Sequence, residues 1–329
     1  MYYIKDYKET DKFTGVYLCR KKQILKTKTD KTYYSLELQD KTGLIDAKIW
    51  NLTNAINDFN ELDFVKAEGL VTSFQGKLQV NIDRLRVAEP GEYDPKEYIP
   101  STRYNTEELY ARLLKYMNSV NNPYLKKLLE HFFVEDRDFI DRFKNHSAAK
   151  SLHHGFLGGL LQHSVFVAMH CDNFSKIYKV LDRDLLITCA LLHDIGKIDE
   201  LTDFPRNDYS DDGQMLGHIY MGAHMIDQAI DQIPDFPHVL RTEVIHCILA
   251  HHGEYEYGSP KKPCIAEALA LNLADNVDAK MENMTELYDK AEPTLDWLGY
   301  QKFYENYIRQ SSGTVEKRTE EALKKGQSS

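Results

Sequence analysis

The sequence predicts two folded units, a small all-β barrel followed by an all-α domain. Three observations predict this class. Residues 13–87 contain short runs in which apolar and polar side chains alternate, as in half-buried strands. A proline-containing stretch follows, and beyond it apolar residues recur at helical spacing. At 329 residues, the chain is long enough for each unit to bury a core of its own.

The N-terminal unit has five predicted strands, at residues 13–18, 33–38, 44–50, 64–74 and 78–87. A short helical stretch is expected over residues 52–59, between the third and fourth strands. This order of elements is the one expected of an OB-fold, a small barrel that commonly binds oligonucleotides. Another small barrel or a sandwich is the alternative interpretation.

Composition sets the domain boundaries. Residues 1–90 form the predicted OB-fold nucleic-acid-binding domain, and residues 91–105 form a linker that contains two prolines and a glycine. Thr106 is the expected N-cap of a helical domain over residues 106–310, in which no alternating run is long enough for a strand. Residues 311–329 are expected to form a frayed polar tail.

The charge and the cysteines limit the function classes. A net charge of −10 argues against a protein that coats nucleic acid through bulk positive charge. Residues 1–90 carry 15 lysines and arginines against 13 acidic residues, so the acidic excess lies in the helical domain and suits a site for divalent cations. No apolar run is long enough for a transmembrane helix. Five scattered cysteines without a CxxC pair, and an N-terminus without an apolar signal region, predict a cytoplasmic protein.

His193 and Asp194 are the first candidate metal ligands. All 13 histidines lie after residue 130, and His193-Asp194 directly follows the apolar helical run 185–192. Ligands at the end of a buried helix are held rigidly. Gly196 is expected to let the chain turn away and leave a coordination position open.

Two further helices offer similar residues. His163 lies at the start of one apolar helical run, and Asp275 ends another. Three buried helices that direct imidazole and carboxylate groups inward can build a metal site in an all-α scaffold. Nitrogen and carboxylate ligands suit Mn, Fe, Zn, Co or Ni better than Ca or Cu(I).

A second set of histidines predicts a second metal. His218 is expected to begin one helix, and His251-His252 end another. With Asp194 as a bridging carboxylate, His218 and one or both of His251 and His252 complete a second site. Two metals about 3.5–4 Å apart can activate a water and stabilise both the attacking and the leaving oxygen of a phosphodiester. Six histidines lack such a setting and are left out: His131, His146, His170, His224, His238 and His246.

These residues resemble a known family. His163, His193-Asp194 and Asp275 resemble the HD superfamily of metal-dependent phosphohydrolases, which are all-α enzymes, and the added histidines resemble its dinuclear members. Segment 151–164, SLHHGFLGGLLQHS, and the order of an OB-fold before the HD domain resemble the YhaM-type 3′→5′ exoribonucleases. The likeness covers about residues 10–310.

The chain departs from the usual YhaM-type segment at several positions. It has Gly155-Phe156 where the family usually has Ala-Tyr, and Gln162 and Ser164 flank His163 in place of Glu and Thr. No presumed ligand is lost, but Phe156 lacks a tyrosine hydroxyl that could contact substrate.

The resemblance implies an exonuclease that removes nucleotides from the 3′ end of single-stranded RNA, with DNA as a second candidate substrate, as nucleoside 5′-monophosphates. Its metal would be Mn in preference to Fe, Co, Ni, Zn or Mg, as two ions. The implied ligands are His163, His193, Asp194 and Asp275 for the first ion, and Asp194, His218 and one or both of His251 and His252 for the second. Asp194 and Lys197 would act at the phosphate. His154 is the candidate acid for the leaving group, and the alternative is that it is an ordinary structural histidine.

The predicted barrel offers a binding surface for single-stranded nucleic acid, with RNA favoured. Bases could stack on Tyr33, Trp50 and Phe74, while Lys48 and Arg84 could follow the backbone. The alternative for each aromatic side chain is that it fills the barrel. No membrane partner is expected, and the sequence leaves homo-oligomer formation open.

Two other functions compete with this one. The first is an HD enzyme for free nucleotides or cyclic dinucleotides, but the residues after His251-His252 lack the Gly-Tyr-Pro of the cyclic-dinucleotide class. The second is a single-strand binder without activity, and seven intact candidate ligands argue against it. Hydrolysis of labelled RNA beside a panel of small nucleotides separates the three.

Overall fold

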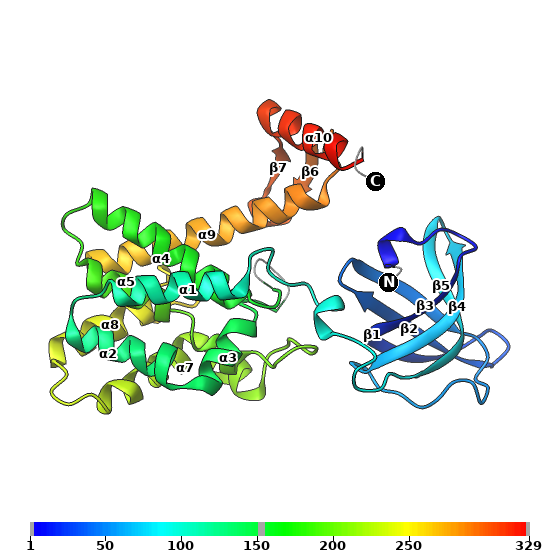
Figure 1. Ribbon diagram of the computed structural model, residues 1–329, viewed down its shortest axis with the longest axis horizontal. Coiled ribbons are helices and arrows are strands. Elements are labelled where there is room, and N and C mark those ends of the chain that lie inside the picture. The colour runs from blue at the N-terminus through cyan, green and yellow to red at the C-terminus, as the bar shows by residue number, and fades with distance from the viewer. Residues whose placement is uncertain (1–2, 151–154, 327–329) are drawn as a thin grey trace.

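The structure is a computed structural model that describes residues 3–150 and 155–326. Two separate hydrophobic cores lie in two domains, an N-terminal barrel and a helical body. Figure 1 shows the barrel and the body side by side, joined by the segment that precedes the first long helix. The predicted fold class, an OB-fold barrel followed by an all-α domain, is therefore confirmed.

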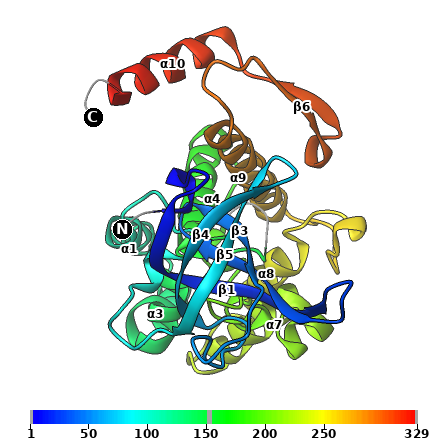
Figure 2. The same ribbon diagram turned by 90° about the vertical axis from the view of Figure 1, so that its right-hand side faces the viewer.

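Five strands form the barrel: β1 (Lys12–Lys26), β2 (Thr32–Asp40), β3 (Gly43–Ile49), β4 (Phe64–Phe74) and β5 (Lys77–Val87). They close in the order β1-β2-β3-β5-β4, with β3 and β5 parallel (Figure 2). Because side chains alternate along a strand, Leu36 and Leu38 point inward while their neighbours face out. A short 3₁₀ turn, η1 (Ile4–Asp6), precedes the barrel, and η2 (Pro95–Glu97) lies in the linker.

The predicted helix over residues 52–59 is wrong. This segment is irregular, and Ile56 forms an isolated bridge to Leu85 of β5. Asn51, Asn54, Asn57 and Asp58 supply short polar side chains that compete with helical hydrogen bonds. Phe59 is then buried in the barrel core.

Nine helices of the described residues build the body: α1 (Thr106–Asn118), α2 (Pro123–Glu130), α3 (Arg137–Asn145), α4 (Gly159–Ile177), α5 (Arg183–Leu192), α6 (Lys197–Glu200), α7 (Asp211–Asp231), α8 (His238–Ala250) and α9 (Ala266–Lys290). A π-helical turn, η3 (His131–Glu135), follows α2, and η4 (Tyr255–Tyr257) follows α8. Asn105, not Thr106, caps α1, since its side chain accepts from two backbone amides. Every residue of α5 from Leu185 on is buried, so this helix runs through the centre of the body.

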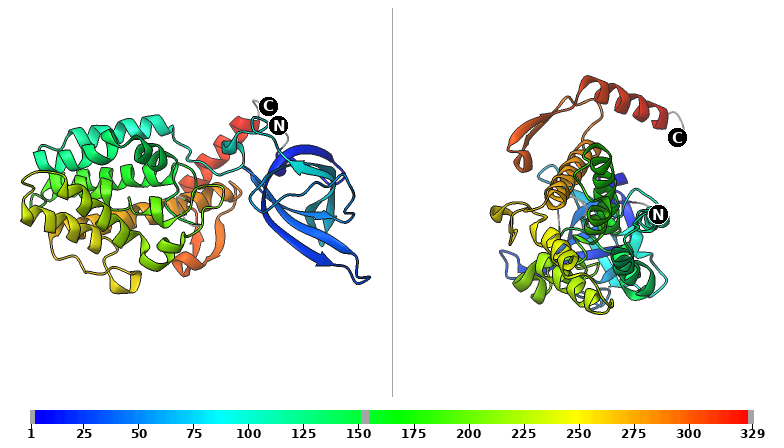
Figure 3. Two further views of the ribbon diagram at one scale, coloured as in Figure 1. Left: turned by 90° about the horizontal axis from the view of Figure 1, so that it is seen from below. Right: turned by 90° about the vertical axis from the view of Figure 1, so that its left-hand side faces the viewer.

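The C-terminal part differs from the prediction. Where helix was expected up to residue 310, β6 (Trp297–Gln301), η5 (Lys302–Tyr304) and β7 (Asn306–Arg309) form a hairpin, and α10 (Ser312–Gly326) replaces the frayed tail. Two strands this short contain too few alternating residues to be recognised. Figures 1 and 3 show α9 extending out of the body and carrying this hairpin and α10 at its end. Within the described residues, the helices are too short or too polar to cross a bilayer.

Candidate metal centre

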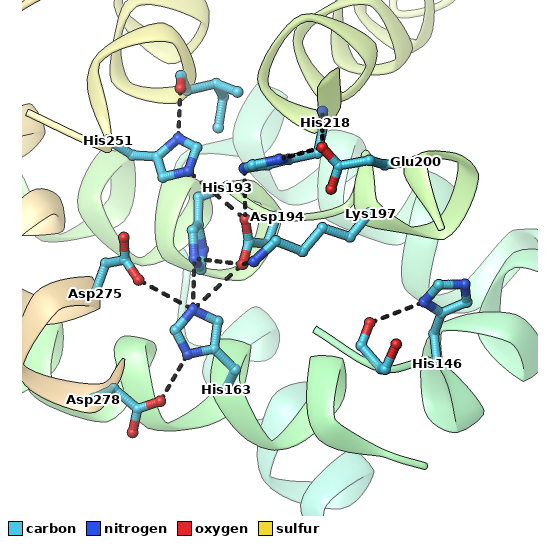
Figure 4. A network of polar contacts seen from close by, with 12 residues as sticks. His146, His163, His193, Asp194, Lys197, Glu200, His218, His251, Asp275 and Asp278 are labelled. Atoms are coloured by element: carbon cyan, nitrogen blue, oxygen red, sulfur yellow. Dashed lines mark hydrogen bonds and ion pairs between the residues drawn. The ribbon is translucent and has the colours of Figure 1, made fainter. Parts of the chain in front are cut away.

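Polar side chains from the ends of α4, α5 and α8 and from the interiors of α7 and α9 point into the middle of the body (Figure 4). His163 lies in the first turns of α4, and His193 and Asp194 directly follow α5. All three are buried, with at most 3% of their surface exposed. Burial of two imidazoles and a carboxylate in an apolar core is costly unless each has a partner.

The first group of donors consists of His163, His193 and Asp275, whose ligand atoms lie within 4.8 Å of one another. His163 Nε2 lies 3.1 Å from His193 Nε2, 3.2 Å from Asp275 Oδ1 and 3.3 Å from Asp194 Oδ2. Two ring nitrogens and two carboxylate oxygens thus converge on one point, as the ligands of a cation do. Asp275 was expected at the end of a helix and lies instead in the interior of α9.

The second group consists of His218, His251 and His252, again within 4.8 Å of one another. Asp194 faces both groups, because its Oδ2 lies beside His163 and its Oδ1 lies 3.5 Å from His218 Nε2 and 3.7 Å from His251 Nε2. Asp194 thus lies between the two groups, as the predicted bridging role requires.

The donors fit divalent cations. Among the residues that the structure describes, the buried atoms Asp194 Oδ1, His218 Nε2 and His251 Nε2 have no hydrogen-bond partner. Buried polar atoms almost always have one. These three face one another, and a cation between them would satisfy them together. Imidazole and carboxylate donors suit Mn, Fe, Co, Ni and Zn.

A second layer of hydrogen bonds orients the rings. Nδ1 of His193 donates to the Ala190 carbonyl at 2.8 Å, and Nδ1 of His251 donates to the Ile248 carbonyl at 2.7 Å. His252 bonds the Tyr257 carbonyl in the same way at 2.8 Å. In each ring, the lone pair of a neutral imidazole is therefore on Nε2, which faces the centre.

Sequence reasoning missed two carboxylates in this layer. Asp278 lies 2.7 Å from His163 Nδ1, and Glu200 lies 2.9 Å from His218 Nδ1. Asp278 follows Asp275 by three residues and therefore shares its helix face, which was a usable signal. Glu200 had no such signal, because the approach of α6 to α7 is a tertiary feature.

At Asp194 and His251 the electrostatics favour the forms that bind metal, whereas at His163 burial is outweighed by hydrogen bonds to Asp194, Asp275 and Asp278 that raise the pKa, so a metal would displace a proton there. Burial raises the pKa of Asp194, but Lys197 and His193 outweigh it and hold the pKa well below its usual value. Burial, together with His252, holds the pKa of His251 well below its usual value. Ionised carboxylates and neutral imidazoles are the states that coordinate divalent ions.

Two glycines place His218, neither in the way predicted. Gly196 has right-handed helical backbone angles, so it makes no special turn. A Cβ there would lie 2.2 Å from the His218 carbonyl oxygen, so glycine is needed for the close approach of α6 to α7. His218 does not begin a helix but follows a kink within α7 at Gly217, whose φ of 73° favours glycine.

A cavity of about 120 Å³ gives access to the centre, lined by Ala148, His163, Asp194, Lys197, His252, Asp275, Asn276 and Ala279. Lys197 Nζ donates to Asp194 Oδ2 at 2.6 Å, which keeps the lysine ammonium group beside the carboxylate. Although burial lowers the pKa of Lys197, Asp194 raises it above the usual value, so the ammonium stays charged. His154, the expected acid, lies outside the described residues.

The barrel residues singled out from the sequence lie outside its core. Tyr33 and Trp50 stack on each other with ring centroids 4.6 Å apart, next to the outward side chains of β2 and β3. Phe74, at the turn between β4 and β5, is 61% exposed. Arg84 is exposed on β5, and Lys48 Nζ donates to Ser35 Oγ at 2.6 Å.

Two family models match the chain, one described as an HD domain over residues 160–280 and one as an OB-fold nucleic acid binding domain over residues 19–88. Together they include the metal centre and most of the barrel. They agree with the donor set in supporting a metal-dependent phosphodiesterase that acts on nucleic acid.

Solved structures show more distant likeness. The second OB-fold domain of replication protein A from Methanococcus maripaludis is 21% identical, over 27% of this chain and 96% of that one, with a TM-score of 0.23. A replication protein A heterotrimer bound to ssDNA is 19% identical, over 26% of this chain and 63% of that one, with a TM-score of 0.20. The HD domain of the L. monocytogenes phosphodiesterase PgpH is 16% identical, over 62% of this chain and 84% of that one, with a TM-score of 0.26. From its own topology and the two family models, the chain consists of an OB-fold barrel followed by an all-α HD domain.

Proposed function

We propose that the protein is a YhaM-type 3′→5′ exonuclease that hydrolyses single-stranded RNA to nucleoside 5′-monophosphates. The observation that carries the proposal is Asp194, whose two oxygens face two separate groups of donors. Two ions about 4 Å apart, held in this way, would acidify a water and neutralise the phosphate charge. Manganese is the preferred metal in the proposal.

The chain's own residues hold and orient the phosphodiester. His163, His193 and Asp275 form one side of the centre, and His218, His251 and His252 form the other. Lys197 keeps its charge within the access cavity and is placed to contact a phosphate oxygen. The oxygen of the attacking water joins phosphorus as the bond between phosphorus and the 3′-oxygen of the preceding nucleotide breaks. His154 is the proposed donor of a proton to that leaving oxygen.

The cavity size supports attack at an end of the strand. A volume of about 120 Å³ accommodates one phosphate group rather than a length of folded nucleic acid. The barrel would hold the rest of the strand through Tyr33, Trp50, Phe74 and the nearby cations Lys48 and Arg84. Free thiols at all five cysteines fit a reducing compartment, so the proposed site of action is the cytoplasm.

The test uses single-stranded RNA labelled at either end, with purified protein and Mn²⁺. A 3′ label should appear at once as mononucleotide, whereas a 5′ label should give a descending ladder. A 3′-phosphate should slow the reaction, because it brings a second dianion against Asp194 and Asp275. Early fragments of intermediate length, products ending in a 3′-phosphate, or hydrolysis of small nucleotides alone would contradict the proposal.

A further inference from the structure

A second cavity of about 320 Å³ adjoins the metal centre in the helical body. Its volume lies within the range of small-molecule sites, about 300–1,000 Å³. Ser147 lines this cavity, and the next residue, Ala148, lines the cavity of the metal centre. On the other side, Arg142 Nη2 donates to the carbonyl of Ile198, the residue after Lys197, at 2.6 Å. The two cavities therefore share a wall.

His146 places a buried polar atom without a partner at this cavity. The side chain is 97% buried, and its Nδ1 donates to the Ser147 carbonyl at 2.9 Å (Figure 4). Its Nε2 has no hydrogen-bond partner among the described residues. Nε2 lies 3.7 Å from Oδ1 of Asp203, another residue of the cavity wall. Burial lowers the pKa of His146, so the ring is neutral. Because Nδ1 carries the proton that binds the Ser147 carbonyl, Nε2 is an acceptor.

The cavity wall is held by hydrogen bonds. Asn207 is buried, accepts from the Ser147 hydroxyl, and donates to the carbonyls of Ala149 and Lys150 at 3.1 Å each. The loop that carries Asp203 is closed where the Thr202 amide donates to the Asp208 carbonyl at 2.7 Å. A site held in this way loses little conformational freedom when a ligand binds.

The chemistry of the wall is that of a nucleobase site. Phe204 and Leu157 supply apolar surface for a flat ring. His146 Nε2 and the Asp203 carboxylate accept hydrogen bonds. Arg142, fixed to the Ile198 carbonyl and 2.9 Å from Asp199 Oδ1, is a donor. The ligand must therefore donate at one edge and accept at another.

We infer that this cavity binds a guanine base. Guanine combines the N2 amino donor with the acceptors O6 and N7, and arginine is the commonest partner of those two acceptors. Adenine, cytosine and uracil each have one donor group on the base, whereas guanine has two adjacent ones, N1–H and the N2 amino group, for the acceptors His146 and Asp203. That the ligand is a nucleobase rests on the proposed function, because a nuclease meets bases beside its scissile phosphate.

The loop also contacts the barrel. Arg20 of β1 donates to the carbonyl of Pro205, next to Phe204, at 2.8 Å. The cavity wall therefore touches the barrel on one side and the helix that begins with Lys197 on the other. A base bound here would lie between the surface proposed to hold the strand and the centre proposed to cut it.

The test measures binding of guanosine, adenosine, cytidine and uridine to the full-length metal-loaded protein by titration calorimetry. Nucleosides have no phosphate, so their binding does not depend on the metal centre. Guanosine should bind at least about tenfold more tightly than uridine, the size expected for a two-point contact to a base. Asp203→Asn and Phe204→Leu should each weaken guanosine binding about tenfold. Asp212→Asn, an exposed aspartate outside the cavity, is the matched control and should bind as the unmodified protein does.

The outcomes separate this inference from the proposed function. Equal binding of the four nucleosides, no binding, or guanosine binding unaffected by both cavity variants would overturn the guanine site, whether or not RNA is cleaved. Selective guanosine binding that both variants weaken, in a protein that fails to hydrolyse RNA, would support the site and reject the exonuclease.

Discussion

At the scale of single residues, the site depends on Asp194. Its Oδ2 accepts from Lys197 and faces His163, while its Oδ1 faces His218 and His251 without a hydrogen bond. A carboxylate that served only to pair with Lys197 would not leave one buried oxygen unsatisfied between two imidazoles. A cation beside Oδ1 would satisfy this oxygen and both imidazoles together.

We predict that Asp194→Asn lowers hydrolysis at least about a thousandfold, equivalent to about 4 kcal/mol of barrier. The amide keeps the volume of the side chain but cannot bridge two cations by charge. Steady-state kinetics with labelled RNA and elemental analysis of the purified variant should show lost activity and reduced metal. Circular dichroism should show intact helices. A variant with normal turnover would exclude the bridging role.

Asp278→Asn tests the second layer. Asp278 lies 2.7 Å from His163 Nδ1, and loss of such a partner lowers metal affinity or activity by about 10- to 100-fold. In a metal titration monitored by activity, the metal concentration that gives half-maximal activity should therefore rise. Glu286→Gln, on the same helix and paired with exposed Lys290, is the control and should have no effect. An equal response of the two variants would remove Asp278 from the site.

The residues that sequence could predict are those with a local signal. His193-Asp194 follows an apolar helix directly, and histidines in similar settings share that signal. The structure brings all seven predicted ligands into one centre. Glu200 lies seven residues past His193 and acquires its role only where α6 meets α7. His146 was left out because its burial is invisible in a sequence without a motif.

At the scale of elements, the close contact of α6 with α7 sets the position of His218. We predict that Gly196→Ala lowers the free energy of unfolding by about 1–3 kcal/mol, as overpacking does, because its Cβ would lie 2.2 Å from the His218 carbonyl oxygen. Thermal unfolding should show a lower Tm, and metal binding should weaken as His218 moves. Gly313→Ala in α10 meets no atom within 4 Å and should be neutral or slightly stabilising. If both substitutions leave Tm unchanged, the contact does not constrain the site.

Elements with a long regular pattern were predictable, and short ones were not. The alternation in β2 and β3 and the apolar run of α5 identify these elements from sequence alone. The helix expected over residues 52–59 failed because hydrogen bonds with β5 compete with it. The kink at Gly217 was missed because a glycine within a helical pattern does not reveal its φ angle.

At the scale of the whole molecule, the barrel and the body have separate cores and opposite charge balance. Residues 1–90 have a slight basic excess, while the rest of the chain is acidic. An acidic body attracts cations but repels a polyanion. In the proposed function, the strand must therefore be held mainly by the barrel, and only its end enters the metal centre.

This division predicts that Phe74→Ala weakens binding of a long single strand while leaving a dinucleotide substrate unaffected. Phe74 is 61% exposed, so its removal should not disturb the barrel core, and loss of one stacked base costs about 1–3 kcal/mol, or about 5- to 150-fold in affinity. Fluorescence anisotropy with a 30-nucleotide RNA measures the loss, and KM for a dinucleotide measures the centre alone. Tyr307→Ala, an equally exposed aromatic residue on β7, is the control. If Phe74→Ala raises KM for the dinucleotide as much as it weakens the long strand, Phe74 acts on the catalytic centre and the barrel does not hold the strand independently.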